Sequence, residues 1–109
     1  MATTIRVLAQ AYPTTTNETF LYSGTTTSTV ISSLVVCNQG ATAQYFNISV
    51  SVGGAATATK DYLYYNVIIA GYDTFVSTIG ITCATGDTIR VKSTIANQLS
   101  FAIFGQENS

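Results

Sequence analysis

Histidine and tryptophan are absent from this sequence, and proline occurs once. A Ser-His-Asp or Cys-His arrangement needs an imidazole, so neither form of nucleophilic catalysis is available to the chain. Zinc sites built on imidazole are excluded for the same reason, because the two cysteines alone supply too few ligands. The most common routes to enzyme chemistry are therefore closed by composition.

Charge is also scarce. Charged residues make up 8% of the chain, whereas an average soluble protein has about 25%. Four basic residues stand against five acidic ones, which excludes the basic patch that nucleic-acid binding needs. A neutral polar surface gives little protection against association. It suits either an extracellular domain with a neutral surface or a subunit covered by its neighbours, and we favour the subunit.

The five carboxylates form no recognisable motif. Glycosidase chemistry needs two acids about 5–9.5 Å apart, and Asp61 and Asp73 would qualify only if the fold brought them together. Asp73 and Asp87 are better explained as turn residues that bond their own backbone. A calcium loop of the D-x-D-x-D-G type is missing. We therefore predict no enzyme activity, no cofactor and no bound metal.

The N-terminal residues have no basic segment followed by an apolar run, so we expect no secretory signal. No apolar stretch approaches the roughly 18 residues that cross a membrane, and we expect no membrane association. Without a secretory signal we expect the protein to be made in the cytoplasm, where a disulfide is disfavoured. Cys37 and Cys83, each preceded by β-branched residues, are therefore predicted to be buried thiols.

Apolar residues recur with a period of two rather than the period of a helix. The clearest examples are residues 44–52, 87–95 and 99–104, while residues 27–38 carry apolar groups on both faces, as expected for a central strand covered on both sides. We predict an all-β fold: one domain, residues 1–109, forming an antiparallel β-sandwich of about eight strands, jelly-roll or Ig-like, with short polar terminal tails. The predicted strands are residues 4–10, 18–23, 27–38, 44–52, 61–69, 72–79, 87–95 and 99–104.

Tyrosine is the residue type most open to a functional interpretation. Period-two alternation in residues 61–69 places Tyr62 and Tyr64 outward and Tyr65 inward, and Tyr45 lies on the polar face of its own strand. Tyrosine joins an apolar ring to a polar tip and is enriched at interfaces. These side chains could pack beneath neighbouring loops, contact another subunit, or form a platform on which a sugar stacks.

Seven segments carry a resemblance that spans almost the whole chain. They are LAQAYP at 8–13, FLYS at 20–23, LVVCNQG at 34–40, DYLYY at 61–65, DTF at 73–75, GDTIRV at 86–91 and LSFAIFG at 99–105. Together they resemble small β-sandwich structural proteins of tailed bacteriophages, especially those of aquatic and cyanobacterial hosts. The resemblance implies a non-enzymatic virion component that assembles in the host cytoplasm: a capsid decoration or cement protein, or an accessory protein of the neck, tail or baseplate.

Such components occur in many copies, so the implied partners are further copies of this chain, in a trimer or ring, and virion proteins such as the major capsid or tail protein. The candidate contact residues are Tyr45, Tyr62 and Tyr64, with Ala2, Thr3, Thr4 and Ile5 at one end and Gln106, Glu107 and the residues up to Ser109 at the other. The alternative is a glycan-binding adhesion module with a tyrosine-lined platform. A pilus or surface-layer subunit is disfavoured by the lack of a signal segment.

Overall fold

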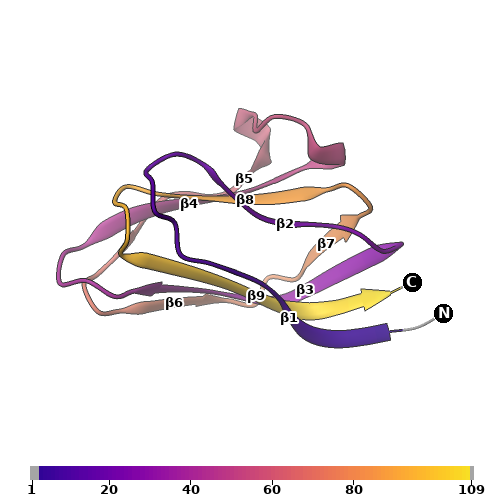
Figure 1. Ribbon diagram of the computed structural model, residues 1–109, viewed down its shortest axis with the longest axis horizontal. Helices are drawn as coiled ribbons and strands as arrows, with labels where there is room; N and C mark the ends of the chain where they lie inside the picture. Colours follow the sequence, from indigo (N-terminus) through magenta and orange to yellow (C-terminus); the bar gives the residue numbers. More distant parts are fainter. Residues whose placement is uncertain (1–2, 109) are drawn as a thin grey trace.

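The computed structural model describes residues 3–108, which form two antiparallel sheets packed face to face (Figure 1). Sheet A has the order β1-β9-β3-β6, with β7 also paired to β3, and sheet B has the order β2-β8-β4-β5. The predicted all-β sandwich is confirmed. The strands are β1 (Thr3–Ala11), β2 (Thr19–Ser23), β3 (Ser28–Asn38), β4 (Gln44–Ser51), β5 (Tyr62–Ile69), β6 (Thr74–Ser77), β7 (Ile81–Ala84), β8 (Thr88–Ser93) and β9 (Leu99–Asn108).

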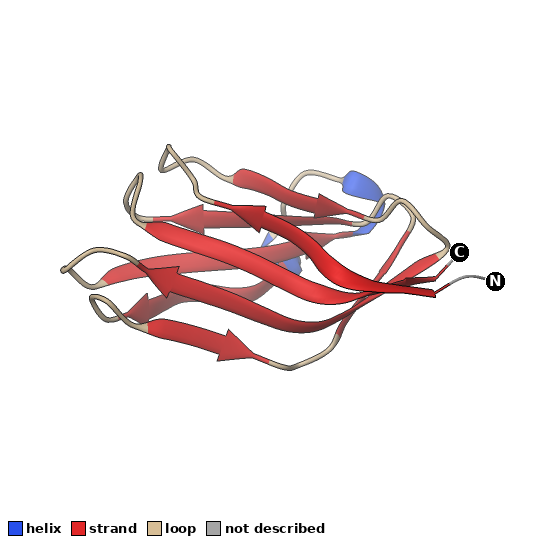
Figure 2. Cartoon of the chain, turned by 60° about the horizontal axis from the view of Figure 1, so that its bottom comes forward, coloured by secondary structure: helices blue, strands red, loops and turns tan. Residues whose placement is uncertain are grey.

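The chain pairs with itself as one long hairpin that is rolled into the sandwich. In the pairs Thr3–Asn108, Leu34–Ser77 and Ser49–Tyr62 the two residue numbers have the same sum, so the chain folds back around its midpoint. The roll is completed when β9 pairs with β3 and β8 pairs with β4. This order is that of a jelly roll and differs from that of an immunoglobulin sandwich. Figure 2 shows the long strands running along the molecule.

The core lies between the sheets and is built from alternate residues of both. Leu99, Phe101 and Ile103, alternate residues of the predicted strand over 99–104, point inward, and each is almost fully buried. From sheet B, Phe46 meets Phe101 with ring centroids 6.1 Å apart. Burial of one such side chain is worth about 1.5–3 kcal/mol, so the strand pattern itself stabilises the sandwich. Ile31, Val36, Ile48, Ile89 and Val91 are buried to the same degree.

Several predicted strand ends and faces are wrong. The predicted strand over residues 72–79 stops at Ser77, and β7 follows Gly80, whose φ of 69° breaks the extended chain. Val52, the last residue of the predicted strand over 44–52, is exposed because the strand ends at Ser51 and the 3-10 turn η1 (Val52–Gly54) follows. The outer side of β3 is not covered within residues 3–108, where Val35 and Cys37 stay half-buried.

The C-terminal residues do not form a polar tail up to Asn108. They continue β9, where Glu107 is buried and accepts hydrogen bonds from Tyr22 (2.6 Å) and Arg6 (3.0 Å). At the other end, β1 already begins at Thr3, while Ala2 lies outside the described residues. Residues 3–5 and 106–108, predicted to belong to tails, are instead strand, because β1 and β9 pair with each other and lie side by side in Figure 1.

Candidate functional site

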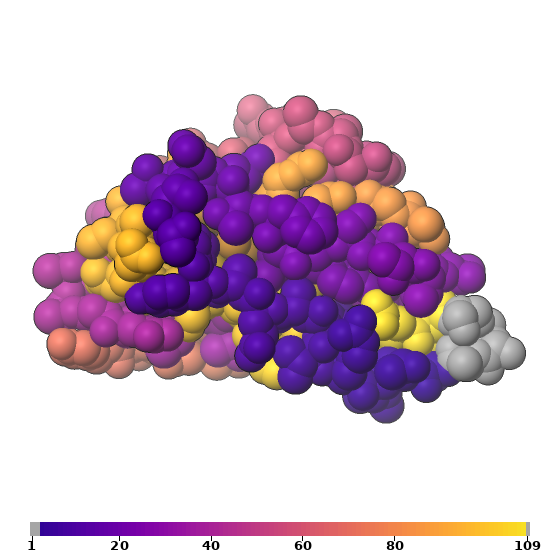
Figure 3. Space-filling view, viewed as in Figure 1, coloured from indigo at the N-terminus to yellow at the C-terminus, as the bar shows by residue number. Residues whose placement is uncertain are grey.

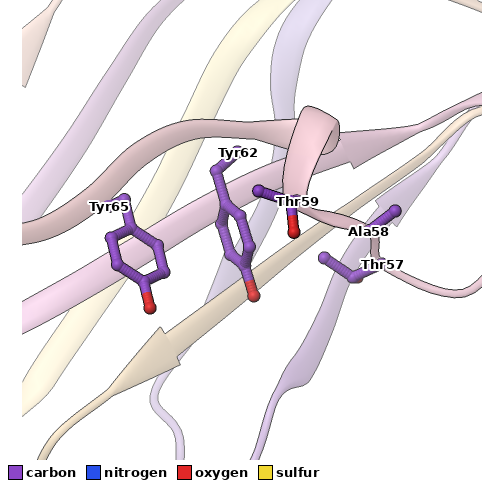
Figure 4. Close-up of a pocket in the computed structure, with 5 residues that line it drawn as sticks. All are labelled: Thr57, Ala58, Thr59, Tyr62 and Tyr65. Atoms are coloured by element: carbon purple, nitrogen blue, oxygen red, sulfur yellow. The ribbon is translucent and has the colours of Figure 1, made fainter.

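The connection between β4 and β5 rises above sheet B and stands out at the top of the molecule in Figure 3. It contains η1 and a second 3-10 turn, η2 (Thr59–Asp61). Between this connection and the start of β5 lies an open hollow of about 470 Å³. Figure 4 shows the five residues that line it, Thr57, Ala58, Thr59, Tyr62 and Tyr65. We call it the tyrosine hollow.

The two tyrosine rings project to the same side of β5 and meet edge to face, with centroids 4.9 Å apart (Figure 4). Residues three apart in a regular strand would point to opposite faces. Here the β4–β5 ladder shifts register between Phe46 and Ile48 and again between Ile48 and Ser49. Asn66 adopts a φ of 51° at the first shift, which places the extra residue of a bulge at this point.

The bulges overturn part of the predicted tyrosine stripe. Tyr64, predicted outward, points into the core, where its ring packs on Phe75 with centroids 5.3 Å apart and its hydroxyl hydrogen-bonds Ser77. Tyr65, predicted inward, is 63% exposed. Tyr62 does face outward as predicted. The pair presented to solvent is therefore Tyr62 and Tyr65 rather than Tyr62 and Tyr64.

Arg90 on β8 of sheet B holds the backbone of the connection between β4 and β5. Its guanidinium donates to Ser51 Oγ (2.8 Å), the Ala55 carbonyl (2.9 Å), Thr57 Oγ1 (3.3 Å) and the Gly54 carbonyl (3.3 Å). Guanidinium presents its donors in a rigid planar fork, so four acceptors from one segment are held in a set arrangement. The outer side of β4 lies beneath the connection, which explains why Ser51 is buried.

Two carboxylates hold the same connection at its ends. Asp61 accepts hydrogen bonds from the Ala58 amide (2.8 Å) and from Lys60 (3.2 Å). Both bonds lower the pKa of Asp61, and the bond from the amide has the larger effect. Asp87 accepts from the amides of Gly53 and Ala84, both at 2.9 Å, and these bonds lower its pKa in turn. Four of the nine charged side chains in the sequence thus converge on one connection.

The carboxylates considered for catalysis bond local backbone instead. Both oxygens of Asp61 are engaged within the connection. Asp73 accepts from the Thr74 amide at 2.8 Å, as a turn residue does. Across residues 3–108, no group of three or more acidic or cysteine side chains comes together in a way that could hold a metal. Cys83 is buried and Cys37 is half-buried. Burial is the main cause that raises the pKa of the Cys83 thiol to about 11.

The remaining predicted contact residues lie apart from the hollow. Tyr45 is exposed on the outer side of β4, as predicted. Thr3, Thr4 and Ile5 are exposed on β1, an edge strand of sheet A, where Ile5 is 79% exposed. Gln106 faces outward beside them, whereas the buried Glu107 is unavailable for a contact between subunits.

Sequence reasoning missed a larger feature, the outer side of sheet A. Its cross-strand neighbours form two short apolar rows, Val7–Phe104 across β1 and β9 and Ala102–Val35–Val76 across β9, β3 and β6. We call this surface the outer apolar face. Val76 is 59% exposed and Val7 46%. The apolar residues on both sides of β3 were the sequence signal for the outer apolar face. Only the strand order shows which residues of neighbouring strands enlarge this face.

Fold and surfaces together define the class of this protein, a jelly-roll sandwich with a projecting connection and an apolar face that residues 3–108 leave uncovered. No family model matches the sequence, and no curated protein matches it. Among solved structures, a chain in the structure of infectious bursal disease virus Gx strain matches 96% of this chain with a TM-score of 0.53 and 12% identity. A chain of the Gt strain matches 95% with a TM-score of 0.50 and 12% identity.

This chain spans only 32% of the length of the Gx-strain chain and 30% of the Gt-strain chain. At 12% identity the likeness shows a shared fold. Within the described residues, no helix is long and apolar enough to cross a bilayer.

Proposed function

We propose that this protein is a non-enzymatic structural component of a tailed-phage virion, as capsid decoration or cement protein or as an accessory protein of the neck, tail or baseplate. The outer apolar face carries the proposal. A contiguous apolar surface on a small domain usually marks a site of protein contact. Val35, at the centre of this face, has apolar neighbours on both sides, Ala102 and Val76.

The charge distribution supports repeated packing. A net charge of −1 gives copies of the chain little mutual repulsion. Edge strand β1 borders the outer apolar face and exposes Ile5 and Val7, so a neighbour there would meet both apolar side chains and free backbone groups. We infer a homo-oligomer, a trimer or ring, that contacts the major capsid or tail protein.

The jelly roll is consistent with this role, since the architecture recurs in viral capsid and lectin domains. The two solved neighbours come from structures of a virus, and the part of them that matches this chain is one such sandwich. The likeness to small phage structural proteins in the seven sequence segments points to the same role. Assembly would take place in the host cytoplasm, and the finished protein would reside in the virion.

The test compares two charged substitutions at equally exposed positions. Val76 and Ile68 are both 59% exposed, but Val76 lies on the outer apolar face of sheet A and Ile68 on the edge strand β5 of sheet B. A phage carrying Val76→Lys should lose the protein from purified particles, because burial of an ammonium in the contact is unfavourable. Ile68→Lys should leave its copy number unchanged, as read by quantitative mass spectrometry. Equal copy numbers in both variants, or no protein in wild-type particles, would refute the proposal.

A further inference from the structure

We propose that the tyrosine hollow binds a neutral carbohydrate, with one sugar ring stacked on Tyr62 and Tyr65. This goes beyond the role in the virion, because a ligand site on the projecting connection does not depend on which protein covers the outer apolar face. The hollow measures about 470 Å³, within the range of about 300–1,000 Å³ that small-molecule sites occupy.

The chemistry of the lining selects the class of ligand. Two phenol rings, two threonine hydroxyls and one alanine line the hollow, and none of the five carries a charge. A sugar matches such a surface because one side of its ring is made of C–H groups and its edge of hydroxyls. The rings of Tyr62 and Tyr65 offer apolar area with a polar tip, and Thr57 and Thr59 offer donors and acceptors beside them. An anionic ligand would find no cation among these groups.

The hydroxyls of the two rings are left for a ligand. Tyr12, Tyr22 and Tyr64 each use their hydroxyl in a hydrogen bond within the fold. For Tyr62 and Tyr65, residues 3–108 supply no such bond, and the two rings contact each other instead. Aromatic side chains that are not needed by the core and stay 63% exposed, as Tyr65 does, are suited to meet a molecule from solvent.

The wall of the hollow is rigid before any ligand arrives. Arg90 bonds Thr57 and the backbone just before it, and Asp61 bonds the amide of Ala58, so the residues that face the rings are fixed by charged hydrogen bonds. A site already held in its bound shape loses less conformational entropy on binding. Four of the nine charged side chains lie around this one connection, and their hydrogen bonds hold the site in shape.

The experiment is an NMR titration of the full ¹⁵N-labelled chain with lactose, mannotriose and maltoheptaose as neutral probes and sialyllactose as an anionic comparison. We expect at least one neutral probe to shift amide signals of residues 57–65. Tyr65→Ala should weaken that binding about tenfold or more, which corresponds to the loss of one stacked ring. Tyr62→Ala is the second variant with the same expectation, and Tyr45→Ala is the control, since Tyr45 is exposed outside the hollow.

Three results would overturn the proposal. The first is no shift at residues 57–65 with any neutral probe at millimolar concentration. The second is an equal loss of binding in Tyr45→Ala. The third is a shift of these amides when the protein concentration is raised without sugar, which would assign the hollow to a contact between copies of the chain. Incorporation into particles reports on the outer apolar face alone, so failure of the two proposals can be told apart.

Discussion

Removal of the Tyr22 hydroxyl should destabilise the fold, because this group joins the two sheets. Tyr22 lies on β2 of sheet B, is 6% exposed, and donates to Glu107 Oε2 at 2.6 Å. Its oxygen is also 3.0 Å from Thr29 Oγ1. Glu107 in turn forms an ion pair with Arg6 at 2.9 Å. One hydroxyl thus links β2 directly to β3 and β9 of sheet A, and Glu107 extends the link to Arg6 of β1.

The magnitude follows from the charged acceptor. A hydrogen bond to a charged group contributes about 1.5–3 kcal/mol, roughly twice a neutral one. Tyr22→Phe keeps the ring and its burial, so we expect a loss of about 2 kcal/mol in the free energy of unfolding at pH 7. For a domain of this size that corresponds to a fall in Tm of about 10 °C. Glu107→Gln should cost a similar amount, and the double variant should cost less than the sum.

The pH dependence gives an independent signature. The hydrogen bond from Tyr22, followed by Arg6, holds the pKa of Glu107 below its ordinary value of 4.5 despite burial. The stability from this group is therefore present above pH 4.5 and lost as the pH falls through the folded-state pKa. Burial and then the bond to Glu107 raise the pKa of Tyr22 above 10.0, so its contribution is complete below pH 10.0 and lost as the pH rises further.

Urea unfolding followed by circular dichroism across pH measures both effects. The difference between wild type and Tyr22→Phe should be largest near neutral pH and shrink below pH 4.5 and above pH 10.0. Tyr45→Phe serves as the control, because Tyr45 is exposed. A free energy of unfolding for Tyr22→Phe within about 0.5 kcal/mol of wild type, or a difference that does not depend on pH, would refute the role given to this hydroxyl.

Two further outcomes follow from close packing and from burial. Gly105→Ala should lower the free energy of unfolding by about 3 kcal/mol, because its Cβ would lie 2.0 Å from the Val30 carbonyl oxygen, a backbone atom that cannot move aside. A thermal melt measures the effect, and a melting temperature equal to wild type would contradict that packing. Cys83 should resist iodoacetamide at pH 8 in the folded protein and react once urea unfolds it, since its pKa of about 11 leaves little thiolate; rapid alkylation of the folded protein would contradict its burial.

The period-two pattern was sufficient for most strands and for the inward side of β9. Burial alternates from Leu99 through Glu107, although Ala102 and Phe104 on the outward side are apolar too. What the pattern could not give was the end of that strand. Glu107 is held by Tyr22 and Arg6, which lie 85 and 101 positions away in the sequence, so a polar residue near the terminus looked like part of a tail.

The tyrosine stripe failed for a different physical reason. Alternation assumes a regular strand, and β5 has two register shifts against β4. The shift between Ile48 and Ser49 falls between their partners Tyr64 and Tyr62. It reverses the facing of the residues that follow, so Tyr64 points into the core and Tyr65 out to solvent. Neither shift has a clear sequence signal, since Asn66 with its positive φ is an ordinary polar residue in the sequence. The role of Arg90 could not be predicted either, because its acceptors lie 33 to 39 positions away in the sequence.

The most direct test of a role in the virion is a cryo-EM reconstruction of phage particles, at a resolution that locates the strands of this protein. We expect many symmetry-related copies, with Val35 and Val76 of the outer apolar face packed against a neighbouring chain. Particles without the protein, or copies whose outer apolar face lies open to solvent, would contradict it.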